Sequence, residues 1–298
     1  MKTFKYQNKR DKNYFEGWYL RFTNSQTNDN YAVIFALTKS LDDPHSFIQV
    51  FHQDDDKCEY LRFSVNDFSY DYGSNTVRIK NNYLSLNELH VEGNQQIDIS
   101  LRNHSFLKVG NKNKSAMSYL RHLPLECFQE VIYLDAEFSG TIKKDKEINI
   151  SGKAYLEKTY GNNFPSKWVW LQSNHNVENS FSFSVGKVPF HFLTINGFFL
   201  LLQAKDKYYR FSTTNLSTIK VEPFKGGVVV IIRRGFYKVK IHANMLQSTE
   251  LVGPSKGGVM SLSVNESLQS TARIKLYKFN KLIFDELFEN VGFENMYK

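Results

Sequence analysis

The chain has 298 residues, 41% of them hydrophobic and 23% charged, which is typical of a globular protein with room for two domains and a large core. The net charge is +8, but the Lys and Arg residues are scattered without an arginine-rich stripe or a known nucleic-acid motif, so we expect no nucleic-acid partner. Two cysteines exclude a disulfide framework, and no apolar run reaches the roughly 18 residues of a membrane-spanning helix.

The first residues, MKTFKYQNKRDK, are polar and charged, so we expect no secretory signal and a cytoplasmic location. The positive charge has two interpretations. In the first, the charges only solvate the surface. In the second, a basic face makes peripheral contact with anionic lipid headgroups.

Strand signals follow one another along the chain, and the 25 Phe, 17 Tyr and 3 Trp residues favour strands over helices. Segments rich in β-branched and aromatic residues, separated by turn clusters, predict strands at 31–37, 47–51, 76–79, 97–101, 131–138, 168–173, 181–185, 198–203, 208–213, 228–232, 237–243, 259–264, 272–277 and 282–288. Residues 117–128 predict at most a helical turn. This pattern of short, regularly spaced strands is typical of β-sandwiches and barrels.

A turn-rich stretch at 160–167 contains two Asn, a Gly and a Pro and is the best candidate for a domain boundary. We therefore expect an all-β protein of two closely packed antiparallel units, with an N-terminal domain at residues 1–162 and a C-terminal domain at 163–298. A cleft between or inside these units is the expected ligand site.

The common cofactor and catalytic signatures are missing. The sequence has no phosphate-binding loop, no dinucleotide fingerprint, no zinc-protease motif and no nucleophile elbow. We therefore expect no metal and no cofactor.

The first unusual segment is EGWYLRF at 16–22. In a strand, Glu16 and Trp18 share one face, while Tyr19 and Arg21 share the other. A carboxylate beside a Trp on an otherwise apolar face is uncommon in a core.

The second segment, AYLEKTYG at 154–161, places Tyr155, Glu157 and Thr159 on one face of a strand. The plain interpretation of Glu157, as of Glu16, is an ion pair with a neighbour such as Arg21 or Lys158.

The third segment, WVWLQSN at 168–174, has an apolar face and a face of aromatic and amide groups. The second face consists of Trp168, Trp170, Gln172 and Asn174. The apolar face can serve a core, whereas the buried amides need hydrogen-bond partners from a ligand, from water or from neighbouring backbone. Satisfied core residues are the alternative to a ligand cavity.

These segments resemble the tocopherol cyclase-like family, whose members carry an EGWY segment and a run close to Y-x-E-K-x-W-G-x-x-F-P-x-x-W-x-W-x-Q-x-N. The positions that match in register are Tyr155, Glu157, Lys158, Gly161, Phe164, Pro165, Trp168, Trp170, Gln172 and Asn174. Weaker matches extend along nearly the whole chain and include LPLECF at 123–128 with Glu126, Glu266, and VGFE at 291–294.

The resemblance implies two lipocalin-like antiparallel β-barrel or sandwich units packed together, similar to carotenoid hydratases. It also implies an isomerase reaction in which an acid protonates a prenyl double bond and a phenol oxygen attacks the resulting tertiary cation. The expected partner is an apolar prenylated or polyene small molecule, such as a prenylquinol or another isoprenoid.

This chain departs from the family pattern at three places. Tyr160 replaces a Trp, and Gln129 and, approximately, Ala136 stand where the family pattern has His. These changes leave open whether the chemistry is retained.

The residues present suit such chemistry, because a carboxyl group in an apolar pocket stays protonated near neutrality and aromatic faces stabilise cations. We predict Glu157, Glu16 and Tyr160 as catalytic residues. The predicted substrate-binding residues are Trp18, Tyr19, Glu126, Tyr155, Trp168, Trp170, Gln172, Asn174 and Glu266. The alternatives are a non-catalytic lipocalin-like carrier of an apolar molecule and a protein-interaction module.

Overall fold

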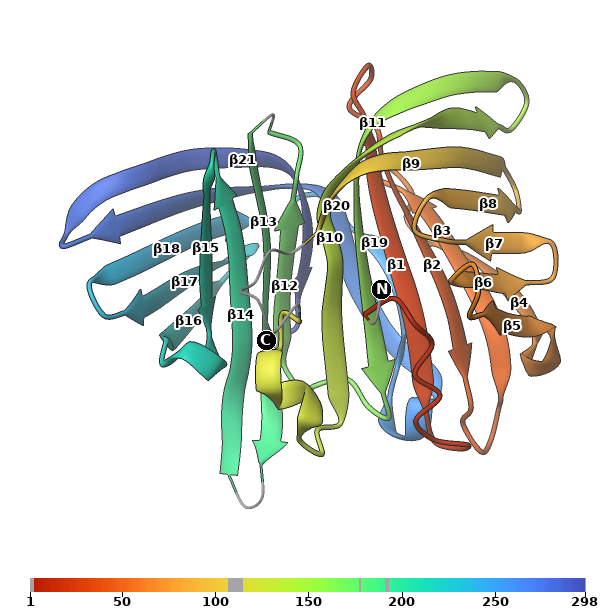
Figure 1. The fold of residues 1–298 in the computed structure, drawn as a ribbon, viewed down its shortest axis with the longest axis horizontal. Coiled ribbons are helices and arrows are strands. Elements are labelled where there is room, and N and C mark those ends of the chain that lie inside the picture. Colours follow the sequence, from red (N-terminus) through yellow and green to blue (C-terminus); the bar gives the residue numbers. More distant parts are fainter. Residues whose placement is uncertain (1–2, 107–114, 177, 191–192, 298) are drawn as a thin grey trace.

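The computed structural model describes residues 3–106, 115–176, 178–190 and 193–297, and these form two large antiparallel sheets (Figure 1). The all-β class expected from the sequence is confirmed. The helical elements of the described residues are single 3-10 turns: η1 Val65–Asp67, η2 Ser118–His122, η3 Thr213–Asn215 and η4 Lys256–Gly258. Of these, η2 is the turn expected within residues 117–128. None of the described helices has the length and apolar character needed to span a bilayer.

The first sheet contains eleven strands in the order β4-β3-β2-β1-β11-β10-β9-β8-β7-β6-β5 and curls into a nearly closed barrel. Its strands are β1 Phe15–Asn24, β2 Asn30–Thr38, β3 His45–His52, β4 Glu59–Ser64, β5 Phe68–Asp71, β6 Thr76–Ile79, β7 Asn82–Leu84, β8 Glu88–Glu92, β9 Gln96–Phe106, β10 Cys127–Lys143 and β11 Glu147–Gly161.

The second sheet follows the order β15-β14-β13-β12-β21-β20-β18-β17-β16, with β19 paired to β20. Its strands are β12 Trp168–Ser173, β13 Asn179–Phe190, β14 Leu193–Ala204, β15 Lys207–Ser212, β16 Thr218–Phe224, β17 Gly227–Arg234, β18 Tyr237–Asn244, β19 Thr249–Pro254, β20 Met260–Lys278 and β21 Lys281–Asn295. The chain changes sheet between β11 and β12. Whether the two halves are independent domains divided at residues 162/163 stays a prediction.

The described residues form four apolar cores, of which the smallest contains Tyr14, Phe128 and Tyr160. The other three are larger. One fills the first sheet, one fills the second, and a third lies between the two sheets with contributions from both. The predicted alternation in β12 explains how one strand serves two cores: Val169 and Leu171 belong to the second sheet's core, while Trp168 and Trp170 belong to the core between the sheets.

Strand β1 lies at the centre of the first sheet and divides its side chains in the same way. The register pairs Trp18 with Lys158, and Tyr19 with Glu157. Because opposite residues in an antiparallel pair share a face, Trp18 and Lys158 lie inside the first sheet, whereas Tyr19 and Glu157 face the second sheet. The alternation thus places the Glu157 carboxylate and the Lys158 ammonium group, which are neighbours in the sequence, on opposite faces of the sheet.

Candidate active site between the two sheets

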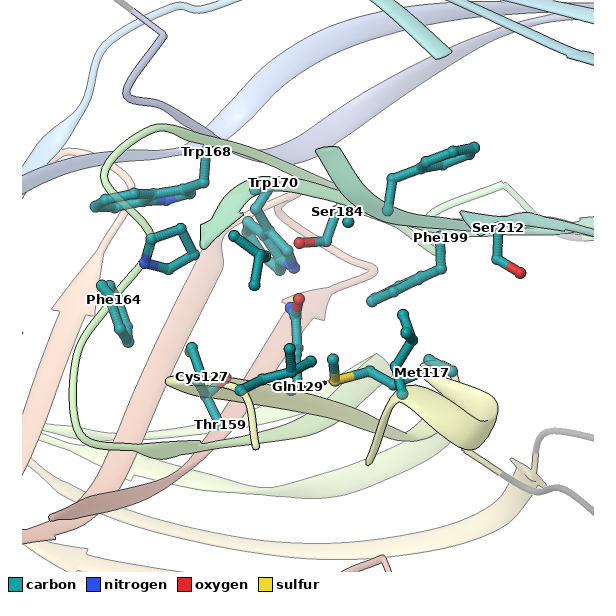
Figure 2. A pocket seen from close by; sticks show the side chains of 18 of the residues that line it. Met117, Cys127, Gln129, Thr159, Phe164, Trp168, Trp170, Ser184, Phe199 and Ser212 are labelled. Carbon is teal, nitrogen blue, oxygen red and sulfur yellow. Dashed lines mark hydrogen bonds between the residues drawn. The ribbon is translucent and has the colours of Figure 1, made fainter. Parts of the chain in front are cut away.

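Two adjoining cavities lie where the sheets meet, with volumes of about 140 Å³ and about 100 Å³. The larger cavity is lined mainly by apolar side chains from η2, β13 and β14, including Leu120, Val188 and Phe199. Figure 2 shows Gln129 and Trp170 pointing toward one another from opposite sides of it. The smaller cavity is lined by residues of β1, β2, β3, β19 and β20, among others.

Five residues line both cavities and form what we call the shared wall: Tyr19, Glu157, Thr159, Phe164 and Glu294. Two of them are acids. Glu266, a third acid, lines the smaller cavity. A mainly apolar site therefore contains three carboxyl groups, which we call the acid cluster.

Glu157 is 6% exposed, and both of its carboxyl oxygens accept hydrogen bonds. The Gln129 amide lies 3.0 and 2.9 Å from the two oxygens, the Tyr155 hydroxyl is at 2.5 Å, and the Trp170 indole N–H is at 3.1 Å. Burial raises the pKa of Glu157 to about 7, although the hydrogen bonds from Tyr155, Gln129 and Trp170 oppose that shift. All three donors are neutral, so no ion pair holds this carboxyl group ionised.

Glu266 and Glu294 face one another on adjacent strands, since they are directly opposite in the β20–β21 register. The two carboxyl groups are close enough that, in addition to burial, the charge on Glu294 raises the pKa of Glu266. The Tyr19 hydroxyl donates to Glu266, and the Trp168 indole N–H donates to Glu294 at 2.5 Å. The pair is therefore a dyad of neighbouring acids with an aromatic donor on each side.

The pKa values of this dyad follow from its surroundings. Burial raises the pKa of Glu294 to about 7, and the charge on Glu157 adds to the effect. The pKa of Glu266 is well above its ordinary value, first because of burial and then because of the charge on Glu294. Two carboxylates in one dry site repel one another, so the second proton is hard to remove.

Arg21 is buried behind the dyad and lowers the pKa of Glu266 through its charge. Its guanidinium donates to neutral oxygens: the side chains of Gln172 at 3.0 Å and Asn30 at 2.9 Å, and the carbonyls of Leu268 at 2.8 Å and Asn290 at 2.5 Å. The cation thus connects the two sheets and offsets the negative charge of the acid cluster without forming an ion pair.

The predicted catalytic residue Glu16 lies outside both cavities. It is fully buried inside the first sheet, where it accepts a hydrogen bond from the Lys158 ammonium at 2.9 Å. Its second oxygen accepts from the Tyr14 hydroxyl at 2.5 Å. The plainer interpretation of Glu16, an ion pair with Lys158, is therefore the one that the geometry shows.

Trp18 and Tyr160 also lie away from the cavities. Trp18 donates its indole N–H to the Phe4 carbonyl at 2.8 Å, as expected of a satisfied core residue. Tyr160 stacks on Phe128 with ring centroids 5.0 Å apart, and the Lys158 ammonium lies 5.1 Å from its centroid. These aromatic rings surround a structural ion pair, so their geometry gives them no contact with a cavity ligand.

Three further predicted residues support the site from outside the cavities. Tyr155 is buried and bridges Glu157 and the Ser182 hydroxyl. Gln172 accepts from Arg21, and Asn174 donates to the Ala154 carbonyl at 2.9 Å across the sheet junction. Neighbouring groups therefore satisfy Tyr155 and Asn174, whereas the buried Gln172 Nε2 has no hydrogen-bond partner among the described residues.

Glu126, by contrast, is exposed and contacts neither cavity. Of the twelve site residues predicted from the sequence, those that line a cavity are Glu157, Tyr19, Trp168, Trp170 and Glu266.

The sequence did not single out Glu294 or the hydrogen bond from Gln129 to Glu157. The VGFE segment at 291–294 was a signal for Glu294, since it places an acid at the end of an apolar strand. Its importance depends on pairing with Glu266, and strand register between distant segments cannot be read from one sequence.

The model of the tocopherol cyclase-like family matches residues 90–294. Among solved structures, the fold is similar to CghA in complex with Sch210972, with a TM-score of 0.58, 10% identity and coverage of 95% of this chain and 88% of that chain. Kievitone hydratase from Nectria haematococca gives a TM-score of 0.54, 14% identity and coverage of 94% and 88%. An AttH-like protein from Nitrosomonas europaea gives 0.55, 12% identity and coverage of 95% and 93%.

These structural similarities confirm the expected fold of two lipocalin-like units. No curated protein matches the sequence. The family model spans more than half of the chain and ends at Glu294, a residue of the shared wall. The chain belongs to the tocopherol cyclase-like family.

Proposed function

We propose that the chain binds a prenylated aromatic or related isoprenoid in the two cavities and closes a ring by protonating an alkene of that molecule. The observation that carries the proposal is the shared wall, where acids with raised pKa values border two apolar cavities. Protonation of an alkene needs a carboxylic acid that is still protonated near neutral pH and is shielded from water. Family membership and structural neighbours that include a hydratase support a catalytic role.

Glu157 is the proposed proton donor, because it borders both cavities and its pKa lies near neutrality. Its contact with Gln129 suits both protonation states. The Gln129 amide donates to the carboxylate as placed, and a half-turn of the amide would present its oxygen to a protonated Glu157. Gln129 can therefore stabilise Glu157 before and after the proton leaves.

The reaction conserves atoms and electrons. Glu157 gives its proton to one alkene carbon, and the other carbon becomes a tertiary cation. A lone pair of the substrate's phenol oxygen then bonds to that cation, and the phenol proton returns to the carboxylate. The faces of Trp168 and Trp170 line the larger cavity and can stabilise the positive charge, an effect worth about 1–2 kcal/mol per desolvated contact. The product is an isomer of the substrate.

Replacing Glu157 by Gln tests this assignment. The E157Q variant keeps the shape of the side chain and removes the acid, so the turnover of geranylated and farnesylated hydroquinones should fall by at least about a hundredfold. Product formation is followed by chromatography and mass spectrometry. The matched control is E126Q, which changes an exposed Glu outside the cavities and should leave turnover unchanged. Unchanged turnover in E157Q would show that Glu157 is not the proton donor.

A non-catalytic carrier of the same class of molecule is the second candidate, and Gln129 favours it because the family pattern has His at that position. A carrier would bind the hydroquinone and release it unchanged. Native mass spectrometry of the protein before and after incubation separates the two cases. A stoichiometric complex whose ligand is recovered without ring closure supports the carrier.

A further inference from the structure

The far end of the second sheet presents two exposed aromatic rings. The β17–β18 and β20–β21 hairpins turn at this end, at the left edge of Figure 1, and we call it the hairpin tip. Phe236 is 67% exposed and Phe279 is 63% exposed, yet their rings stack with centroids 4.2 Å apart. The Phe279 N–H also donates to the Phe236 carbonyl at 3.0 Å, which fixes the two turns side by side.

Two more exposed apolar side chains follow Phe279 in the chain. Leu282 and Ile283, at the start of β21, are 44% and 41% exposed. Single exposed apolar side chains are common on protein surfaces and need no explanation, whereas a stacked aromatic pair on a projecting end is a candidate contact site.

The charge on the two turns and the strand ends next to them has one sign. Residues 233–240 and 275–284, the two turns with their flanking strand ends, contain seven Lys and Arg residues and no Asp or Glu. Of the seven, only Lys275 forms an ion pair with an acid of the described residues, at 3.3 Å from Asp285. Lys278 and Lys238 instead lie over tyrosine rings, at 5.7 Å from Tyr237 and 5.3 Å from Tyr277. The cations are therefore available to an external anionic partner.

We propose that the hairpin tip docks on an anionic lipid membrane, with Phe236 and Phe279 entering the headgroup region and the surrounding cations contacting lipid phosphates. Exposed apolar side chains surrounded by Lys and Arg bind such an interface, because the rings are buried among the lipids while the cations are attracted to the anionic headgroups. Nucleic acid fits less well, since single strands bind in basic grooves, whereas these turns project from the molecule.

Vesicle sedimentation tests the proposal with the full chain. The wild-type protein should sediment with vesicles of phosphatidylcholine and phosphatidylglycerol, and much less with phosphatidylcholine alone. The F236S/F279S variant should bind the anionic vesicles about tenfold less tightly, because it loses both inserted rings. The K278E/K281E variant should lose about a hundredfold or more, because it reverses two charges at the surface.

Matched controls lie at the opposite sheet. The L41S variant, at an exposed apolar residue, is the control for F236S/F279S. The K144E/K146E variant, at two exposed lysines, is the control for K278E/K281E. Both controls should bind vesicles like the wild type, and circular dichroism should show all variants folded. Three results would overturn the proposal: no preference for anionic vesicles, equal losses in tip and control variants, or a dimer in solution that F236S/F279S dissociates. Displacement of the vesicles by a single-stranded oligonucleotide bound at the tip would also overturn it.

Discussion

Two glutamates of similar sequence context have opposite roles because the strands place them on opposite faces. Glu16 is compensated by the Lys158 ammonium at 2.9 Å, whereas Glu157 has only neutral donors around it. A buried carboxylate without a cation is costly, and the cost is relieved by keeping the proton. The same residue type therefore serves as a structural anion in one place and as a proposed acid in the other.

The raised pKa of Glu157 predicts how stability depends on pH. The folded protein retains this proton up to about pH 7, while the unfolded chain loses it near the ordinary value of 4.5. Folding must therefore take up a proton between these values, so the free energy of unfolding falls as pH rises from about 4.5 to 7. At about 1.4 kcal/mol per pH unit, Glu157 accounts for about 3 kcal/mol of that fall.

Urea unfolding between pH 5 and 8 measures this effect. The E157Q variant cannot ionise, so its stability should depend less on pH than that of the wild type, while the Glu266–Glu294 dyad keeps part of the dependence. The exposed E126Q variant is the control and should follow the wild-type curve. An equal pH dependence in E157Q and the wild type would show that Glu157 has an ordinary pKa.

At the scale of the strands, the position of Trp170 depends on a glycine in the neighbouring strand. A Cβ added to Gly292 would lie 2.7 Å from Cζ3 and 2.8 Å from Cη2 of Trp170. The indole ring therefore lies directly against the β21 backbone, and this position allows its N–H to reach Glu157.

The G292A variant should displace the Trp170 ring and lower the free energy of unfolding by about 1–3 kcal/mol, the usual cost of overpacking. Thermal unfolding and tryptophan fluorescence report the two effects. The control is G73A, because Gly73 is exposed and a Cβ there would meet only the flexible end of Asp71. Identical melting temperatures for G292A and the wild type would contradict the close packing.

The strand pattern made the faces of the key segments predictable, and this explains which parts of the site the sequence revealed. Period-two alternation separated Trp168 and Trp170 from Val169 and Leu171, and the structure places these pairs in different cores. Alternation cannot say which face becomes a cavity, so Glu16 and Glu157 looked equivalent. The Glu266–Glu294 dyad depends on register between two strands, and that register is fixed by tertiary packing.

At the scale of the whole molecule, Arg21 joins the two sheets on one side of the site. Its guanidinium donates to groups from β12, β20 and β21 and to Asn30 of its own sheet. Replacement by Met would leave several buried oxygens without donors, so the free energy of unfolding should fall by about 3 kcal/mol or more. Replacement of Arg21 by Lys should not restore the stability, because an ammonium group lacks the planar set of N–H donors of a guanidinium.

Chemical unfolding of R21M and R21K measures this loss. The matched control is R62M, which removes an exposed Arg that pairs with Asp43 and should cost less than about 1 kcal/mol. Similar losses in R21M and R62M would show that Arg21 contributes no more than a surface cation.

The central claim is that an enclosed acid protonates a carbon atom of an apolar substrate, and turnover in D₂O tests it most directly. If Glu157 delivers the proton as proposed, that proton comes from solvent, so each ring-closed product formed in D₂O should carry one deuterium on carbon that does not wash out in H₂O. Mass spectrometry of the product from geranylated hydroquinone measures this label. Ring closure without carbon-bound deuterium, or recovery of unchanged substrate from a stoichiometric complex, would contradict the account.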